Sequence, residues 1–170
     1  YKLRGLAVFR AVYYLPNLIS AVSVAFLFKT LLDWKYGSIN QILMSIGITK
    51  TPVNWLGQVT TAPNVTALIS AWMWFGNSFI ILMAGVQGIS KDYFEAAALD
   101  GAGQWKVFTK ITIPLLRPII LYVFITSLIG GLQMFDMPFL ISGGTSGAPS
   151  GSLQTVVMYL YKFGFETNQV

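Results

Sequence analysis

The sequence predicts an all-α, polytopic membrane protein with three spans and a helix-turn-helix loop between the second and third. Of the 170 residues, 55% are hydrophobic and only 10% are charged, whereas soluble domains carry about 25% charged residues. A soluble fold would have difficulty burying so much apolar surface. Residues 11–28, 51–90 and 118–135 contain no charge. Each stretch can hold a bilayer-spanning helix, which needs about 20 residues.

Charge and composition exclude several functional classes. The net charge is +5, but the 11 basic residues are spread along the chain without an arginine or lysine cluster. We therefore interpret them as topogenic charge and not as a nucleic-acid site. The chain has no cysteine and no histidine, which excludes disulfides, zinc sites and histidine-based catalysis. No cofactor and no metal site are expected.

The first span is expected over residues 11–32. It follows Lys2, Arg4 and Arg10, a basic flank that marks the cytoplasmic side. Pro16 lies within it, and neighbouring helices can satisfy the carbonyl that a proline leaves free. The predicted topology is therefore in to out, out to in, and in to out.

An outer connection is expected over residues 33–64, with one short interfacial helix near 39–46. An aromatic belt is expected there, formed by Trp34, Tyr36 and Trp55. The second span is expected over residues 65–89. Small residues at spacings of four and seven predict a close helix contact, and they are Ala67, Ala71, Ser78 and Gly85.

The third span is expected over residues 118–141, after a proline turn at 114–118. Residues 142–152 form a Gly/Ser loop without apolar content and are expected to be exposed. Residues 153–165 are too few to span and predict either an interfacial helix or the approach to a further span. The chain begins without methionine and ends in polar sequence, so we expect it to be incomplete at both ends.

Residues 90–114 have more pattern than a solvated hairpin needs, although an unspecialised hairpin is the alternative. Ser90 can cap a short helix over 91–100, and Gly101 stands where a helix end needs positive φ. A second helix should place three residues at near-helical spacing on the membrane side, namely Trp105, Phe108 and Ile111. Its other face carries Lys106 and Lys110, which suit acidic protein or lipid headgroups.

The same loop resembles the EAA loop of the membrane-spanning subunits of bacterial binding-protein-dependent ABC importers. That pattern is EAA, three residues, Gly, nine residues and Ile-x-Leu-Pro. Six positions match at full spacing, namely Glu95, Ala96, Ala97, Gly101, Ile111 and Pro114, and the departure is Ile113 in place of Leu. By resemblance the loop enters a cleft of the ATP-hydrolysing subunit, where Glu95 pairs with a basic or polar partner. The coupling residues are then Glu95, Ala96, Ala97, Asp100, Gly101, Ile111 and Pro114.

The wider resemblance is to the carbohydrate-specific branch, which includes permeases for multiple sugars, maltose and glycerol 3-phosphate. The residues that carry it are Pro16, the 33–40 stretch with Tyr36-Gly37, Asn54 to Gly57, Pro114 to Pro118, Phe135-Asp136 and Gly143-Gly144. It implies a multi-pass subunit of the bacterial inner membrane with a second permease, two ABC ATP-binding subunits and an extracytoplasmic solute-binding protein as partners. The chain has no GxxxxGKS loop, so ATP must be bound and hydrolysed by a partner, and no enzyme activity is expected.

A substrate path should be lined by polar groups that membrane helices otherwise avoid. The candidates are Trp74, Asn77, Gln133 and Asp136. An aromatic face with a few amide and carboxylate groups suits a sugar. Aromatic residues such as Trp72, Trp74 and Phe75 are more often packing or belt residues, and Asp136 can equally be an interfacial carboxylate.

Two other functions stay open at this point. The solute can be an amino acid or phosphate, although no arginine cluster supports an anion. An integral membrane enzyme is the alternative outside transport. Its catalysis would depend on carboxylates alone, and these are Asp33, Asp92, Glu95, Asp100, Asp136 and Glu166.

Overall fold

The computed structural model describes the backbone of residues 6–166 and the side chains of residues 12–166. The predicted basic flank at Lys2 and Arg4 and the side chain of Arg10 lie outside the described residues. Within 6–166 the chain is helical and has no strand, which confirms the predicted all-α class. The helices are α1 (Leu6–Leu18), α2 (Ala21–Leu31), α3 (Ser38–Ser45), α4 (Ala62–Gln87), α5 (Lys91–Leu99), α6 (Gln104–Val107), the π-helix η1 (Phe108–Thr112), α7 (Ile113–Leu132), α8 (Asp136–Ser142), α9 (Val156–Tyr161) and the π-helix η2 (Lys162–Glu166).

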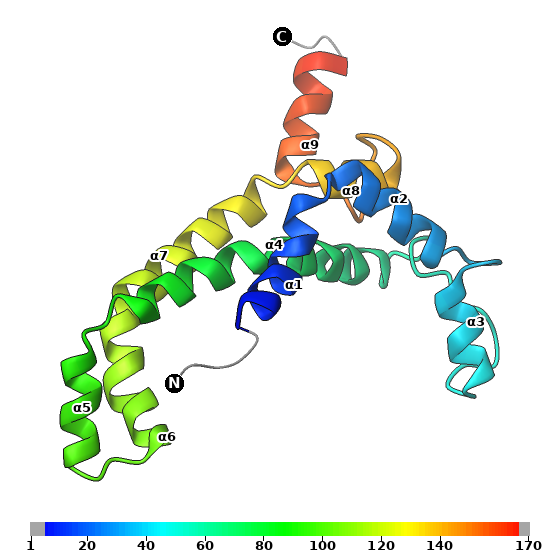
Figure 1. The fold of residues 1–170 in the computed structure, drawn as a ribbon. Helices are drawn as coiled ribbons and strands as arrows, with labels where there is room; N and C mark the ends of the chain where they lie inside the picture. Colours follow the sequence, from blue (N-terminus) through cyan, green and yellow to red (C-terminus); the bar gives the residue numbers. More distant parts are fainter. Residues whose placement is uncertain (1–5, 167–170) are drawn as a thin grey trace.

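The two long helices α4 and α7 form the body of the molecule (Figure 1). Helices α5 and α6 lie at one end of this body, and α3 lies across the other end. Two helical runs in the described residues are long and apolar enough to cross a membrane, Ala62–Gln87 and Gln104–Ser142. A bent pair, Val12–Leu18 with Ala21–Leu31, raises the number of spans to three if it crosses as one unit.

The first predicted span, 11–32, is not one straight helix. Its two halves meet at 104°, because the chain leaves the helix after Leu18 and Ser20 takes an extended conformation with φ −63° and ψ 145°. The Ser20 hydroxyl accepts a hydrogen bond from the Ser23 amide at 3.2 Å and so caps the start of α2. Pro16 removes a backbone donor just before this break.

The third predicted span also differs from expectation. The expected turn at 114–118 is helical, and the helix runs without interruption from Gln104 through α6 and η1 to Leu132. Pro114 and Pro118 both lie inside this run. The helix widens to a π-helix over Phe108–Thr112 directly before Pro114, and a π turn can accommodate a missing backbone donor. The span then breaks at 133–135, and α8 begins at Asp136.

The helices pack through a different face of α4 from the one predicted. Ala67 and Ala71 are exposed, whereas Ala62, Thr66, Ile69, Ser70, Met73 and Gly76 are buried. A Cβ at Gly76 would lie 2.9 Å from the Cα of Tyr14, so α1 crosses α4 with almost no space between the backbones. Among the small residues predicted to make a close helix contact, Gly85 does lie against α7, because a Cβ there would be 2.9 Å from Leu116.

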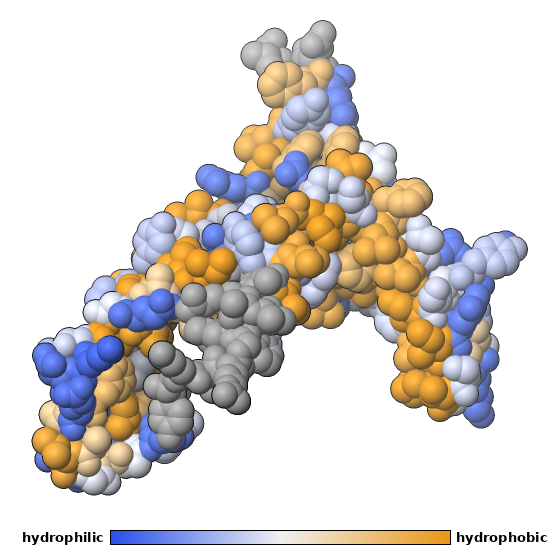
Figure 2. Space-filling model, viewed as in Figure 1, coloured by the Kyte–Doolittle hydropathy of each residue, from blue (hydrophilic) through white to orange (hydrophobic). Residues whose placement is uncertain are grey.

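The main apolar core lies where α2, α4 and α8 meet. Its buried members include Val24 and Ala25 of α2, Ile69 of α4, and Met137 and Ile141 of α8. Apolar side chains also cover much of the outer surface of the body (Figure 2), as expected for helices that face lipid. Hydrophilic residues in the same view gather on α5 and along the outer edge of α3.

The outer connection 33–64 is organised by Asn40, which is 1% exposed. Its amide nitrogen donates to the carbonyls of Asp33, Trp34 and Val53. Its amide oxygen accepts from the Val53 amide at 3.2 Å and from the Trp55 indole at 2.9 Å. One side chain therefore ties the start of the connection to its middle.

The loop at 142–152 was expected to be exposed, and this expectation is only partly right. Ser146 and Ser150 are exposed, but Thr145 and Gly147 are buried. The loop folds back on itself, because the Leu153 amide donates to the Gly147 carbonyl at 3.1 Å and the Gln154 side chain donates to the Thr145 carbonyl at 2.9 Å. The following residues, 156–166, are helical.

Candidate coupling loop and substrate path

The helix α5 has the start and the end that its sequence predicts. The Ser90 hydroxyl accepts a hydrogen bond from the Asp92 amide at 3.3 Å and donates one to the Asp92 carboxylate at 3.0 Å. At the other end Gly101 has φ +67°. The Gly101 amide donates to the Ala98 carbonyl at 3.1 Å and the Ala102 amide donates to the Ala97 carbonyl at 2.9 Å. These two bonds form a Schellman motif, which satisfies carbonyls that the helix end leaves free.

A groove of about 500 Å³ lies between α5 and the α6–η1 segment. Residues from both sides line it, among them Ala96, Ala97, Asp100, Lys106, Lys110 and Ile111. The alanines keep the α5 wall free of bulk, and Ala97 is only 6% exposed. The two carboxylates and two ammonium groups around the groove, from Asp92, Asp100, Lys106 and Lys110, can offer both signs of charge to a partner.

The structure brings most of the predicted coupling residues together. Ala96, Ala97, Asp100 and Ile111 share the groove, and Gly101 forms the turn that closes it. Glu95 is exposed on α5 outside the groove lining, and Pro114 lies in the first turn of α7. Exposure leaves the Glu95 carboxylate accessible to a basic group of a partner.

One detail of the second helix differs from expectation. Trp105 and Phe108 do lie together, with ring centroids 5.9 Å apart, and Trp105 is 77% exposed. Ile111 is not on their face, because it lines the groove beside Lys106 and Lys110. The π-helix over Phe108–Thr112 changes the angular spacing of this segment, so a strict α-helical period misplaces Ile111.

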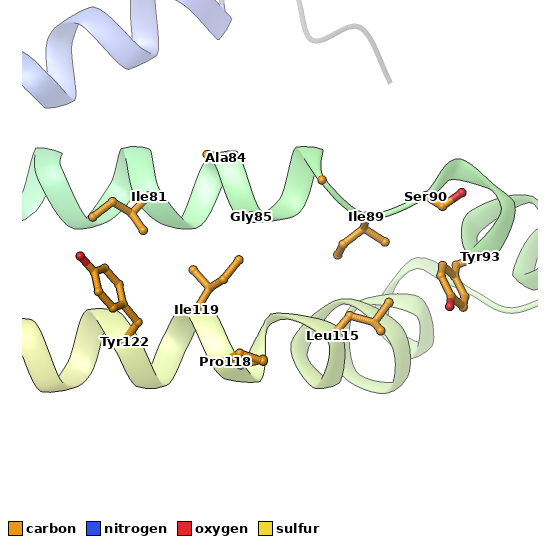
Figure 3. A pocket seen from close by; sticks show the side chains of 11 residues that line it. Ile81, Ala84, Gly85, Ile89, Ser90, Tyr93, Leu115, Pro118, Ile119 and Tyr122 are labelled. Atoms are coloured by element: carbon orange, nitrogen blue, oxygen red, sulfur yellow. The ribbon is translucent and has the colours of Figure 1, made fainter.

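A second, apolar cleft of about 830 Å³ connects the loop to the body. It lies between the last turns of α4 and the first turns of α7, and Figure 3 shows Ile81, Ile119 and Tyr122 facing the space between the two helices. Ser90 and Tyr93 line the end that adjoins α5. The contact between α4 and α7 therefore includes Gly85, Leu116 and Ile119, beside an open apolar cleft.

The four predicted substrate-path residues fall into two pairs. Trp74 and Asn77 lie about one turn apart on α4, and both are exposed. They border the buried residues Met73 and Gly76 of the same helix. Among the side chains that the structure describes, none of the aromatic contacts involves Trp74, whereas its neighbour Phe75 packs on Tyr13 at 5.7 Å.

The other pair flanks the break between α7 and α8. Gln133 ends α7, Asp136 begins α8, and both side chains are exposed. The break exists because α8 turns to bury Met137 and Ile141 in the core. At the far end of α8 the Lys29 ammonium donates to the Leu140 carbonyl at 3.4 Å. An acidic group at the start of a helix and a basic group at its end both favour the helix dipole.

Two structurally important residues escaped the sequence reasoning. Asn40 carries no signal of its own, because its partners lie up to 15 residues away. Gly76 is not one of the regularly spaced small residues from which a close helix contact was predicted. Its role becomes visible only where α1 crosses α4. In the described residues no group of three or more acidic side chains gathers in a way that could hold a metal ion.

Comparisons with known proteins agree with this geometry. The lactose transport system permease protein LacF of Rhizobium radiobacter is 37% identical over 164 residues, which are 96% of this chain and 54% of that protein. The trehalose/maltose transport system permease protein MalF of Thermococcus litoralis is 31% identical, over 96% of this chain and 55% of that protein. The chain thus spans about half the length of these curated relatives.

A solved structure has the same fold. It is a crystal structure of a bacterial ABC transporter involved in the import of the acidic polysaccharide alginate, with a TM-score of 0.87 and 26% identity over 99% of this chain and 58% of that chain. The family described as binding-protein-dependent transport system inner membrane component matches residues 4–163. The chain therefore belongs to this family of transport-system inner membrane components.

Proposed function

We propose that this chain forms part of the permease subunit of an ATP-driven importer in a bacterial inner membrane, and that the imported solute is a sugar or sugar derivative. In this proposal two ABC ATP-binding subunits hydrolyse ATP, a second permease completes the pathway, and an extracytoplasmic solute-binding protein delivers the solute. The chain itself binds no nucleotide. Alternating access opens the pathway to the two sides of the membrane in turn.

The observation that carries the proposal is an unbroken helical run that joins the groove to the candidate substrate path. The helical run from Gln104 to Leu132 has no break and is about 43 Å long at 1.5 Å per residue. Its first turns form one wall of the groove, and Gln133 ends its last turn. A displacement that a partner imposes on the groove is therefore transmitted along one rigid element to the far end.

Sugar as the solute class is supported by chemistry and by relatives. Exposed Trp74 offers an apolar ring face, and Asn77, Gln133 and Asp136 offer the amide and carboxylate groups that orient hydroxyls. Relatives are named for lactose, arabinooligosaccharides and trehalose/maltose. None of these names identifies the sugar that this chain carries.

Coupling is tested with Glu95→Ala and Glu95→Gln in the complete transporter, reconstituted with its solute-binding protein. We expect both variants to assemble but to lose the ATP hydrolysis that loaded binding protein stimulates, together with uptake of labelled lactose, maltose or arabinotriose. The exposed Glu95 carboxylate makes no packing contribution that its loss would remove. Full stimulated hydrolysis in both variants would refute the coupling role, and a wild-type transporter that takes up no carbohydrate would refute the solute class.

The orientation is tested with single cysteines in this cysteine-free chain. Ala98 and Ser146 are both exposed. Ala98 is on α5 and Ser146 is in the loop that follows α8, and α5 and α8 lie near opposite ends of α7 (Figure 1). We expect Ala98→Cys to react with a membrane-impermeant thiol reagent only after the membrane is opened, and Ser146→Cys to react in cells whose outer layers alone are permeabilised. The reverse pattern would place the groove outside and would overturn the proposal.

A further inference from the structure

Four aromatic rings form a continuous row where α8 meets α9. Phe139 stacks on Phe135 with centroids 5.0 Å apart and planes at 18°. Phe135 meets Tyr161 at 5.3 Å, and Tyr161 meets Phe165 at 5.1 Å. The two phenylalanines of the α8 end are half-buried, whereas Tyr161 is 42% and Phe165 is 76% exposed. The row thus runs from the α7–α8 break outward along α9 and η2.

The core does not account for this row. Within α8 the residues that enter the core are Met137 and Ile141, and within α9 the fully buried side chain is Met158. The outer half of the row therefore contributes ring area at the surface and little to the buried core. The surfaces of Tyr161 and Phe165 that the row leaves free can contact a ligand.

Polar residues are sequence neighbours of Phe135. Phe135 is the residue directly before Asp136 and two residues after Gln133, and both polar side chains are exposed. The Tyr161 hydroxyl adds a group that both donates and accepts. Ring faces combined with a few amide, carboxylate and hydroxyl groups are the chemistry that recognises a sugar. Its apolar C–H face stacks on the electron-rich face of an aromatic ring, and its hydroxyls bond to the polar groups.

We propose that Phe135, Phe139, Tyr161 and Phe165 form a carbohydrate-stacking subsite, which extends the candidate path from the α7–α8 break along α9. The inference rests on the proposed function and goes beyond it, because it assigns residues outside the four candidate path positions and predicts a preference. A row of rings longer than one sugar unit favours an oligosaccharide over a disaccharide, since each additional sugar ring gains a stacking contact.

The chain supplies a matched control on the same helices. Tyr159 and Phe163 form a second aromatic pair, with centroids 4.5 Å apart. Tyr159 is two residues from Tyr161, which places it on the opposite side of α9, and it is 51% exposed. If exposed rings on α9 serve only to contact lipid, leucine should replace either tyrosine equally well, because leucine is as compatible with hydrocarbon as an aromatic ring is.

The test measures carbohydrate binding to the purified permease–ATPase complex without its solute-binding protein, by saturation-transfer NMR with lactose, maltose and maltotriose. We expect Tyr161→Leu to raise the Kd for maltotriose about three- to tenfold, with a smaller rise for the disaccharides. Tyr161→Phe keeps the ring and loses only the hydroxyl, so its Kd should lie between those of wild type and Tyr161→Leu, and Tyr159→Leu should equal wild type. Phe165→Leu, at the most exposed position of the row, repeats the test if Tyr161→Leu does not assemble.

The outcomes separate the subsite from the proposed function. Equal Kd values for Tyr161→Leu and Tyr159→Leu, in a transporter whose wild type takes up these sugars, would overturn the subsite and leave sugar import intact. A wild-type complex that neither binds nor transports any of the three sugars, nor arabinotriose, would overturn both. A Kd that rises equally for two and three sugar rings would overturn the predicted length preference and with it the extended row.

Discussion

Replacing Gly101 by alanine should loosen the end of α5 without any steric clash. The space around Gly101 is open, because a Cβ there would meet nothing within 4 Å. Its φ of +67° is the left-handed region, where a residue with a Cβ costs about 1–2 kcal/mol. The penalty therefore comes from the backbone alone, and its size follows directly from the observed conformation.

The assay is hydrogen exchange of the peptide that covers 97–104 in the assembled transporter. The amides of Gly101 and Ala102 close the Schellman motif, so their protection reports its stability. A penalty of about 1–2 kcal/mol reduces protection roughly 5- to 30-fold, since 1.4 kcal/mol corresponds to a factor of ten. Gly101→Pro should be worse, because proline fixes φ near −65° and removes the amide that bonds to Ala98.

The neighbouring Gly103 is the matched control. It has φ −66° and ψ 159°, which any residue adopts, and open space around it. Gly103→Ala should stay within about 0.5 kcal/mol of wild type. If amide hydrogen in the 97–104 peptide exchanges at the same rate in both alanine variants, the left-handed conformation of Gly101 does not hold the loop. Glycine is then not a structural requirement at position 101.

Three further variants probe the body of the molecule. Gly76→Ala places a Cβ 2.9 Å from the Cα of Tyr14 and closer still to the Tyr13 carbonyl oxygen, and it should lower stability by about 1–3 kcal/mol in thermal unfolding. Gly131→Ala meets nothing within 4 Å and should not lower stability. Asn40→Ala leaves buried donors and acceptors without partners at about 1–3 kcal/mol each, so the outer connection should be cut faster by protease, while the exposed Gln41→Ala should not change the rate. Asp136→Asn keeps the shape but loses charge-assisted bonds to hydroxyls, and we expect a loss of apparent affinity of roughly ten- to a hundredfold in uptake. Unchanged affinity and rate would mean that Asp136 serves only the start of α8.

The parts of the fold that follow from neighbouring residues could be predicted. The cap at Ser90 and the left-handed Gly101 depend on hydrogen bonds within four or five residues, so the sequence around them carries all the information. The long apolar run that became α4 needed only hydropathy and length. The two-helix loop of residues 90–114 was therefore predictable in outline, whereas the groove between its helices was not predicted.

The remaining features depend on the direction that the chain takes after a helix ends and on contacts between residues far apart in the sequence. Hydropathy shows that residues 11–32 are apolar but not that the chain turns by 104° within them, although Ser20 after Pro16 is a capping signal that could have indicated the break. The fold of the outer connection depends on Asn40 reaching Val53 and Trp55, which no local pattern encodes. The helical 114–118 segment was misjudged because two prolines normally end a helix, whereas here a π-helix precedes them.

The packing of α4 suits the proposed coupling between the groove and the candidate path. Its first half belongs to the core with α2 and α8, and its second half meets α7 around Gly85 beside an apolar cleft. The run from Gln104 to Leu132 contacts α4 around Leu116 and Ile119, which lie near the middle of the run. A rigid element that turns about its middle moves both ends by similar amounts, so in the proposed function a push on α5 and α6 would reach Gln133, where the candidate path begins, with little change in size. In the proposed function, the α4–α7 contact is then the point about which the run turns, and larger side chains in the adjoining cleft would hinder that turn.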